Sequence, residues 1–378
     1  MPVKNTKHID IVGAGIAGLT TALALAEKGH TVRIFEQSPA LEEIGAGLQL
    51  SPNATRIFDA LGLRDDLAEV WYEPDHLQLV SGLSLRTLAR LPVRAMSRDR
   101  WMAPYAVIHR ARLQDVLLNA SRRYSSIKFE FGKRIEAPAS GGADVTVGAD
   151  GVWSSLRRTV RGSAEPRFSG YAAWRATLPI AELPKSFSHT DVTALLGPGA
   201  HLVIYRIGSE TINLVATIPE HRSEKGWNLK GDASRLLAAF KRWNASIGIV
   251  LAKAEWRHWP IYEVADASWR GDDNTILIGD AAHAMAPHAA QGAAMAIEDS
   301  CELASWLDRT DIETATALMR FEAHRRPRIR RVGQRGLLNK FAYQAMGPFR
   351  LGRDIVFTLR GGESLLADLD WLYGYRAG

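Results

Sequence analysis

The sequence predicts an α/β protein in which a parallel-sheet domain is interleaved with a mixed or antiparallel β-sheet domain. A short apolar run at 8–12, a glycine cluster, an Ala- and Leu-rich stretch and a β-branched run at 31–36 form one βαβ unit, which requires a parallel sheet. Residues 166–262 instead show short alternating runs separated by turn residues, the pattern of an antiparallel sheet. An apolar strand at 274–278 then restores the α/β pattern.

The elements follow in order along the chain. Helical spacing of apolar residues predicts helices at 16–28, 52–70, 111–124, 233–246, 291–308 and 312–344. No low-complexity linker divides the chain, so we expect one domain to comprise 1–75, 101–165 and 270–345. The second domain would comprise 76–100 and 166–269. Residues 346–378 are expected to form a peripheral, helical C-terminal tail.

The composition excludes several classes of protein. Of the 378 residues, 23% are charged and 46% hydrophobic, which is typical of a globular protein and not of a disordered or fibrous chain. The net charge of +6 is too small for its length to indicate nucleic-acid binding. Cys301 is the only cysteine, so an intrachain disulfide is impossible and a reducing compartment is favoured. With no long apolar segment and no secretory signal pattern, we expect a soluble, cytoplasmic protein without a membrane partner.

The glycine cluster, Gly13-Ala14-Gly15-Ile16-Ala17-Gly18, is a G-x-G-x-x-G fingerprint between a strand and a helix. Gly13 permits the tight turn, Gly15 lets the backbone approach a pyrophosphate, and Gly18 lets helix and strand pack closely. Ala17 lies within the same loop–helix junction. Glu36 ends the next strand, where a carboxylate can accept hydrogen bonds from a ribose diol. The fingerprint predicts a dinucleotide site but leaves NAD and FAD open.

Two further segments carry a family resemblance. GADGVWSSLR (148–157) and GDAAHAMAPHAAQGAAMAIED (279–299), together with the fingerprint, resemble the three motifs of the class A single-component flavin aromatic hydroxylases, which share the 4-hydroxybenzoate hydroxylase fold. GAGLQLSPNATRIFDALGL (45–63) and HLVIY (201–205) are similar to the branch containing salicylate hydroxylase, 3-hydroxybenzoate 6-hydroxylase and 6-hydroxynicotinate 3-monooxygenase. The resemblance covers nearly the whole chain.

The resemblance implies FAD as the cofactor in a Rossmann-like domain, with NAD(P)H as a transient co-substrate. It implies hydroxylation of a phenolic or heteroaromatic acid by O2 through a flavin C4a-hydroperoxide. The absence of a second G-x-G-x-x-G favours this transient use of NAD(P)H. Two alternatives stay open: hydroxylation or epoxidation of a larger non-aromatic or polycyclic substrate, and an FAD-binding protein without monooxygenase turnover. For the assembly, a homodimer is the form we consider.

Further cofactor-binding residues follow from the resemblance. Asp280 would receive hydrogen bonds from the ribityl chain, and the amides of Gly292 and Ala293 would stabilise charge on the reduced flavin. Asp150 in the DG motif would lie near the pyrophosphate, and Gly47 and Arg110 would approach the cofactor. The competing interpretations are structural: Asp280 as a helix cap, Asp150 with Ser154 and Arg157 as a capped turn, and Arg110 as a solvated side chain.

His201 and Tyr205 are the candidate catalytic residues. Residues i and i+4 of a strand share a face, so both side chains can point to one cavity. Histidine suits a general base near neutral pH, and the tyrosine can orient or relay a phenolic proton. Gln49 and Arg175 are candidate substrate contacts, Arg175 through a bidentate pair with a carboxylate. The competing interpretation is a satisfied histidine and a half-buried tyrosine.

Other features receive structural interpretations. His283 is expected to be structural, and no metal site is expected because no partner lies at ligand spacing. The basic run near Pro327 is predicted to be a solvated helix face; it comprises Arg325, Arg326, Arg328, Arg330, Arg331 and Arg335. Two positions depart from the family pattern: Arg112 stands where an acid is usual, and Arg206 where a proline is common.

Overall fold

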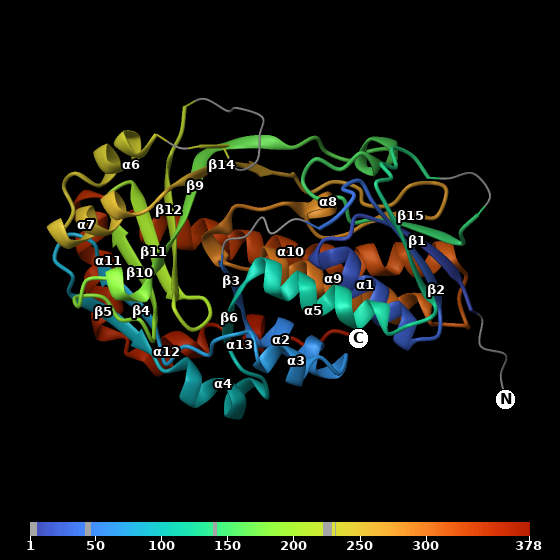
Figure 1. Cartoon of the computed structure of the whole chain (residues 1–378), viewed down its shortest axis with the longest axis horizontal. Helices are drawn as coiled ribbons and strands as arrows, with labels where there is room; N and C mark the ends of the chain where they lie inside the picture. Colours follow the sequence, from blue (N-terminus) through green and yellow to red (C-terminus); the bar gives the residue numbers. More distant parts are fainter. Residues whose placement is uncertain (1–5, 42–46, 139–141, 222–228, 231) are drawn as a thin grey trace.

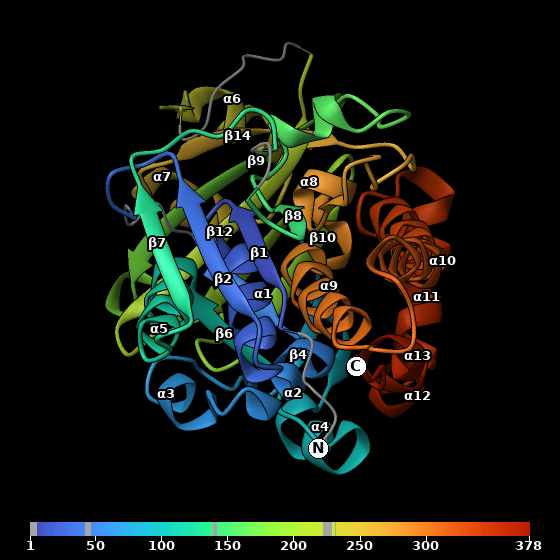
Figure 2. The ribbon, with the colours of Figure 1, turned by 90° about the vertical axis from the view of Figure 1, so that its right-hand side faces the viewer.

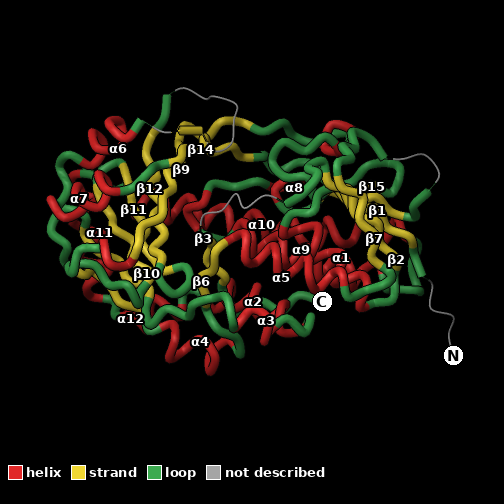
Figure 3. The backbone as a smooth tube through the Cα atoms, in the orientation of Figure 1, coloured by secondary structure: helices red, strands yellow, loops and turns green. Residues whose placement is uncertain are grey.

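The computed structural model describes residues 6–41, 47–138, 142–221, 229–230 and 232–378. Two sheets lie at opposite ends of an elongated molecule, and helices α1, α5 and α9 lie between them (Figure 1). The same division is visible when strands and helices are coloured separately (Figure 3). The predicted α/β class with a parallel sheet and a separate mixed sheet is confirmed.

The first sheet has five parallel strands in the order β15-β8-β1-β2-β7. These strands are β1 (His8–Val12), β2 (Thr31–Glu36), β7 (Ile127–Phe131), β8 (Val145–Gly148) and β15 (Thr275–Leu277). Helix α1 (Ile16–Glu27) connects β1 to β2 and packs against α5 (Arg110–Arg122) and α9 (Gly292–Leu307). Figure 2 shows β7, β2 and β1 side by side. The predicted βαβ unit is therefore present.

The second sheet has eight strands in the order β13-β14-β9-β12-β11-β10-β4-β5. Their bounds are β4 (Leu77–Ser81), β5 (Thr87–Leu91), β9 (Arg167–Pro179), β10 (Val192–Gly197), β11 (Ala200–Arg206), β12 (Thr211–Pro219), β13 (Leu229–Lys230) and β14 (Arg257–Glu263). All neighbouring pairs are antiparallel except β4–β10, which is parallel. The sheet is therefore mixed.

The two faces of this sheet have different roles. Alternate residues such as Trp174, Leu202 and Leu214 form an apolar core with α6 (Ala233–Phe240) and α7 (Ala245–Lys253). The opposite face packs Val203 and Val215 against the core of the parallel-sheet domain. The second face therefore lies at the junction of the two domains.

Two predicted helices are each divided. The helix expected at 52–70 is α2 (Pro52–Ala60) followed by α3 (Arg64–Ala68), separated at Gly62, whose φ is +70°. The helix expected at 233–246 ends at Phe240, and Asn244 caps the separate helix α7 by accepting a hydrogen bond from Ser246 N at 3.0 Å. A left-handed glycine and an Asn cap override helical spacing at these points.

The remaining elements connect the sheets. β3 (Gly47–Leu50) pairs with β6 (Ala106–His109), and α4 (Val93–Trp101) follows β5. Short helical turns are η1 (Leu156–Thr159), η2 (Ile180–Glu182), α8 (Asp280–His283) and η3 (Pro287–Ala289). No helix in the described part of the chain combines the length and apolarity needed to cross a bilayer.

The C-terminal region begins with α10 (Thr314–Tyr343), followed by α11 (Gly347–Leu359), α12 (Gly362–Ala367) and α13 (Asp370–Tyr373). The tail is helical as predicted, but the prediction that it is peripheral is wrong at its end. Leu366, Leu372 and Tyr373 are buried, because this segment packs into the main core. Apolar side chains of α11 such as Phe349 and Leu359 are exposed.

Candidate active site

The glycine loop fits a dinucleotide for distinct reasons at each glycine. A Cβ atom on Gly13 would collide with the carbonyl oxygen of Ala149, and one on Gly18 would collide with the carbonyl oxygen of Gly13. Gly13 also has φ +105°, a conformation that favours glycine. A Cβ on Gly15 would meet nothing within 4 Å, so a ligand can approach the backbone there. Helix α1 begins without a side-chain cap or an acidic residue, which leaves its amides available to a phosphate.

Glu36 is held beside this loop at the end of β2. Its carboxylate accepts hydrogen bonds from Ala14 N and Ser38 N, each at 2.9 Å. Gln114 of α5 fixes the loop from the other side by donating to Ala14 O at 2.9 Å. Ala17, the second residue of α1, packs near Gly279. The carboxylate is therefore fixed where a ribose could reach it.

The DG motif forms a capped turn. Asp150 Oδ2 accepts hydrogen bonds from Ser155 N at 2.7 Å and Leu156 N at 3.3 Å. Ser154 Oγ accepts one from Arg157 N at 2.9 Å. These contacts support the structural interpretation of Ser154. Asp150 Oδ1 is buried without a hydrogen-bond partner among the described residues, so this carboxylate retains an oxygen for a ligand.

Arg157 connects the DG motif to the GD motif. It is 2% exposed and donates to Ala281 O at 2.9 Å and to Val152 O. Its side chain is therefore committed to internal hydrogen bonds between the two motifs. Arg110 is exposed at the first position of α5. Its approach to the cofactor stays a prediction.

The GD motif is fixed from its buried side. Gly279 has φ +56°, and its N–H donates to Asp299 Oδ2 at 2.9 Å. His283 Nε2 lies 2.6 Å from the same oxygen. Burial would raise the pKa of Asp299, but the charges of His283 and Arg325 outweigh it and lower that pKa to about 2. His283 is thus a structural partner of a carboxylate, while Asp280 itself is exposed.

The start of α9 offers a second site for negative charge. A Cβ on Gly292 would meet nothing within 4 Å, and the helix begins without an acidic residue or a side-chain cap. The amides of Gly292 and Ala293 are therefore available to an electron-rich group. Gln291, 2% exposed, donates to Ser51 Oγ at 2.9 Å and accepts from Asn53 Nδ2 at 3.2 Å, so α2 holds this helix start.

These features fit FAD. Backbone is open to a ligand at Gly15 and Gly292, and two helix starts present uncapped amides. Within the described residues, one buried oxygen of Asp150 has no hydrogen-bond partner. Gln291, Ser51 and Asn53 were missed by sequence reasoning. Their signal was a polar Ser-Pro-Asn segment at a helix start, but its partner lies far away in the sequence.

Strand register brings the candidate catalytic and substrate residues to one face. Tyr205 pairs with Asn213, His201 pairs with Thr217, and Val215, which lies between those two on β12, pairs with Arg175. Side chains of directly paired residues share a face, and alternate residues along a strand do too. His201, Tyr205 and Arg175 therefore share the face that turns towards the parallel-sheet domain.

His201 is 4% exposed and surrounded by polar aromatic groups. Its ring centroid lies 5.5 Å from that of His288 and 5.6 Å from that of Tyr343. Gln344 Nε2 lies 3.3 Å from His201 Nδ1. Burial, with a smaller contribution from His288, lowers the pKa of His201 to about 3, so its imidazole is neutral at pH 7.

Tyr205 and Gly47 lie at the junction of the domains. A Cβ on Gly47 would lie 2.6 Å from Tyr205 Cε2, and Gly47 N donates to Asn213 Oδ1 at 2.8 Å. The close approach of β3 to the large sheet therefore explains this glycine. Asn213 Nδ2 and Thr217 Oγ1 are buried without hydrogen-bond partners in the described ranges. Sequence reasoning missed both residues, which share the face of His201 and Tyr205.

Arg175 and Gln49 complete the candidate substrate contacts. Arg175 is half-buried and makes no ion pair with any carboxylate in the described part of the protein; its guanidinium carbon lies 5.8 Å from the centroid of the Trp259 ring. Burial lowers the pKa of Arg175. Gln49 is half-buried and accepts a hydrogen bond from the Tyr105 hydroxyl at 2.6 Å. Arg175 is thus a cation that an anionic ligand would stabilise.

The prediction that the basic run is a solvated face is wrong for two of its members. Arg325 is fully buried and pairs with Glu298 and Asp299, and the Arg328 side chain, 9% exposed, pairs with Glu298. Helix geometry places both arginines on the side of α10 that faces α9, where the two acids are buried. Arg326 lies on the more exposed side and pairs with Asp266.

Comparison with known proteins agrees with this site. Residues 139–335 match the model of a family described as an FAD binding domain, and residues 11–41 match an NAD(P)-binding Rossmann-like domain. The chain is 33% identical over 384 residues to 3-hydroxybenzoate 6-hydroxylase 1 of Aquipseudomonas alcaligenes, covering 97% of each. The chain belongs to the FAD-dependent aromatic hydroxylase family. It is an FAD-dependent monooxygenase, and FAD is its cofactor.

Other members of the family are similarly related. The chain is 30% identical over 342 residues to 6-hydroxynicotinate 3-monooxygenase of Bordetella bronchiseptica, covering 86% of this chain and 89% of the relative. Among solved structures, Klebsiella pneumoniae HpxO in complex with FAD and uric acid has a TM-score of 0.84 at 20% identity, covering 98% of this chain and 97% of that one. A salicylate hydroxylase substrate complex has a TM-score of 0.82 at 20% identity, covering 99% and 96%. These structures share the fold of this family member.

Proposed function

We propose that this monooxygenase hydroxylates a phenolic or heteroaromatic acid. The observation that carries the proposal is Arg175, a desolvated cation without a carboxylate partner among the described residues, on the same sheet face as His201 and Tyr205. An aromatic ring that carries an anionic group and a hydroxyl group could pair its charge with Arg175 and place its hydroxyl beside His201 and Tyr205. Hydroxybenzoate and hydroxynicotinate, named for the relatives above, belong to that class.

FAD, when bound, takes a hydride from NAD(P)H and activates dioxygen for transfer to the ring. The residues proposed to hold it are those of the glycine loop and the surrounding motifs: Gly13, Gly15, Ala17, Gly18, Glu36, Gly47, Arg110, Asp150, Asp280, Gly292 and Ala293. NAD(P)H is proposed to bind transiently. Glu36→Ala should weaken flavin retention, measured as FAD content after gel filtration, and undiminished content would contradict the ribose role.

His201 is the proposed base for the substrate hydroxyl. Its Nδ1 faces the Gln344 carboxamide, and Nε2 is the nitrogen left to meet a substrate. Acceptance of a proton at Nε2 requires the hydrogen of the neutral ring on Nδ1. The Gln344 amide nitrogen faces Nδ1 in the structure, so this tautomer requires the side-chain amide to turn its oxygen towards that atom. Burial raises the pKa of Tyr205, so its hydroxyl stays protonated and can donate to a phenolate oxygen.

Arg175 is the proposed contact for the substrate's anionic group, with Gln49 lining the same space. Burial weakens the hydration of the guanidinium, so a carboxylate that reaches it forms a charge-assisted pair. The same cation favours the phenolate over the phenol, because positive charge lowers the free energy of a nearby anion. Binding and activation of the ring are therefore linked through one residue.

Oxygen uptake across a panel of hydroxylated aromatic acids tests the function. The purified protein should be yellow, and the matching substrate should accelerate NAD(P)H and O2 consumption and yield a product carrying one atom of 18O from 18O2. Peroxide formation without labelled product across the panel would instead favour an FAD-binding protein without monooxygenase turnover.

Two variants test the named side chains. His201→Gln should retain FAD and lose coupled hydroxylation. Arg175→Met should raise KM for the carboxylated substrate by about tenfold to a hundredfold, since hydrogen bonds to charged groups contribute about 1.5–3 kcal/mol. Arg206→Met is the matched control, because Arg206 contacts the turn carbonyls of Gly208 and Ser209. An unchanged KM for Arg175→Met would show that Arg175 does not contact the substrate.

Two properties stay proposals. We propose a homodimer, which sedimentation velocity would test, with a monomer across micromolar concentrations as the contrary result. We also propose cytoplasmic localisation, which fractionation of the source cells would test.

A further inference from the structure

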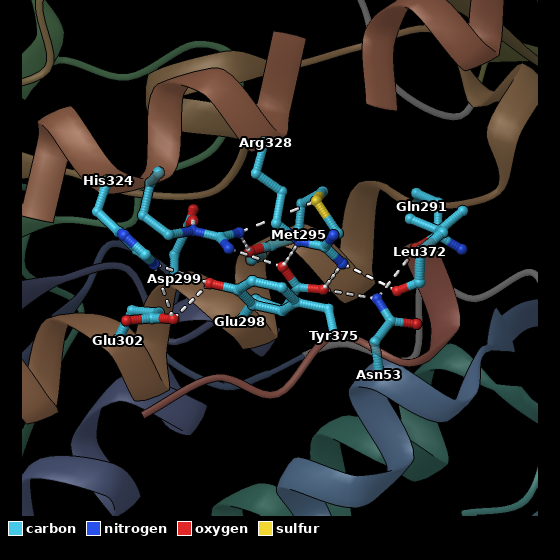
Figure 4. Close-up of polar contacts among 12 residues, drawn as sticks. Asn53, Gln291, Met295, Glu298, Asp299, Glu302, His324, Arg328, Leu372 and Tyr375 are labelled. Carbon is cyan, nitrogen blue, oxygen red and sulfur yellow. Dashed lines mark hydrogen bonds and ion pairs between the residues drawn. The ribbon is translucent and has the colours of Figure 1, made fainter. Parts of the chain in front are cut away.

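A buried cluster of charged side chains lies beneath the flavin-binding motifs. Glu298 and Asp299 of α9 and Arg325 of α10 are each fully buried, and Arg328 of α10 joins them (Figure 4). Arg325 donates to Glu298 Oε2 at 2.7 Å and to Asp299 Oδ1 at 2.8 Å. Arg328 donates to both oxygens of Glu298 at 2.6 Å. We call these four residues the charge cluster.

The charge cluster contacts two parts of the proposed flavin site, the GD motif and, through Asn53, the start of α9. Asp299 accepts the Gly279 N–H of the GD motif at 2.9 Å. Glu298 accepts from Asn53 Nδ2 at 2.7 Å, and the same amide nitrogen lies 3.2 Å from Gln291 Oε1 at the start of α9. One set of carboxylates therefore fixes the backbone of the GD motif and the residue that precedes Gly292.

The C-terminal residues 371–375 close the charge cluster on its remaining side. The carbonyl oxygens of Trp371 and Leu372 accept hydrogen bonds from Arg328 at 3.1 and 3.0 Å. The Tyr375 ring centroid lies 3.7 Å from the guanidinium carbon of Arg328 and 5.6 Å from that of Arg325. The Tyr375 hydroxyl donates to Glu302 of α9 (Figure 4). This segment supplies both neutral acceptors and an aromatic cover.

Such a cover matters because buried ion pairs are costly unless every charge is fully compensated. The two carboxylates already use Asn53, Gly279 and the arginines, and Arg328 needs the tail carbonyls for its remaining N–H groups. Removing the aromatic ring would admit water to Arg328 and weaken its hold on Glu298. The Asn53–Gln291 contact and the start of α9 would then be less firmly fixed.

We propose that residues 371–375 are a positioning element of the flavin site. They touch no reacting atom; they seal the charge cluster, and the charge cluster holds the GD motif and the α9 start in the geometry that binds FAD. The far C-terminus of the chain therefore contributes to flavin affinity through Glu298 and Asp299.

Titration of the FAD-free protein with FAD, followed by flavin fluorescence and the visible absorption spectrum of bound FAD, tests the proposal. Tyr375→Ala should raise the Kd for FAD about tenfold, which corresponds to about 1.4 kcal/mol, and should shift the flavin bands. Tyr375→Phe keeps the ring over Arg328 and should bind as the wild type does. Trp306→Ala is the matched control, because Trp306 lies near the end of α9 and outside the charge cluster, with its ring centroid 5.5 Å from the guanidinium carbon of Arg309.

A Kd within twofold of the wild type for Tyr375→Ala would overturn the proposal, as would an equal rise for Trp306→Ala, which would indicate general destabilisation. Circular dichroism of the FAD-free variants establishes that each is folded. If Tyr375→Ala does not fold, Tyr375→Gln, which occupies part of the space but replaces the apolar cover of Arg328 with a polar group, takes its place: the same tenfold rise in Kd is expected, and a Kd within twofold of the wild type would overturn the proposal.

Discussion

Removal of Arg325 should destabilise the protein far more than removal of its neighbour Arg326. Arg325→Met leaves Glu298 and Asp299, both fully buried, without a shared cation. Breaking a buried pair by removing one partner costs about 3–5 kcal/mol. Arg328 still compensates Glu298, so we expect a loss near the lower limit, about 3 kcal/mol.

The control keeps helix, residue type and substitution constant. Arg326→Met removes an ion pair with Asp266 at 2.9 Å, in which the two side chains are 28% and 35% exposed, and exposed pairs contribute up to about 1 kcal/mol. Urea unfolding of both FAD-free variants, followed by circular dichroism, gives the two losses. A loss for Arg325→Met below about 1 kcal/mol, or no larger than that for Arg326→Met, would refute the argument that the charge cluster needs this cation.

Two further predictions concern the cofactor loop and pH. Gly18→Ala should abolish FAD binding, measured as flavin content, because the added Cβ would collide with Gly13 O. Gly333→Ala is the control and should bind FAD normally, because the space around its Cβ is open. Normal flavin content in Gly18→Ala would contradict the prediction. Burial lowers the pKa of His201 to about 3 and that of His288 to about 4, while an unfolded histidine titrates near ~6.5. The unfolded chain therefore binds protons that the folded chain does not, so the free energy of unfolding should fall by roughly 1.4 kcal/mol per histidine from pH 7.5 to 5.5. Urea unfolding at the two pH values measures this loss. If the double variant His201→Phe, His288→Phe loses as much free energy of unfolding between pH 7.5 and 5.5 as the wild type, the two histidines are not the cause of the loss.

The parts of the site that depend on local backbone could be predicted from sequence. The glycine loop is an example, because the turn at Gly13 and the close packing at Gly18 are imposed within one βαβ unit. The strand at 201–205 is another, because a period of two places His201 and Tyr205 on one face in any register. The identity of the other face-sharing residues required the pairing of distant strands, which spacing does not give.

The parts that depend on distant partners could not be predicted. In the sequence, Arg325 and Arg328 cannot be distinguished from the other arginines of a surface helix. Only the packing of α10 against α9 brings buried acids into contact with them. The adjacent acids Glu298 and Asp299 follow a run of small and apolar residues at 292–297, and this was the available signal that a cation must be buried nearby. Asn213 gave no such signal, since its partner Gly47 lies on another sheet.

Helix α10 connects the charge cluster to the surroundings of the candidate base. Its 30 residues span about 45 Å at 1.5 Å per residue. Arg325 in its first half belongs to the charge cluster beneath the GD motif. In its last turns Asn339 donates to His288 O at 3.1 Å, and Gln344, directly after the helix, contacts His201. One helix therefore contacts the charge cluster, the loop before α9 and the residue next to the proposed base, and so links the proposed cofactor site to the candidate catalytic residue.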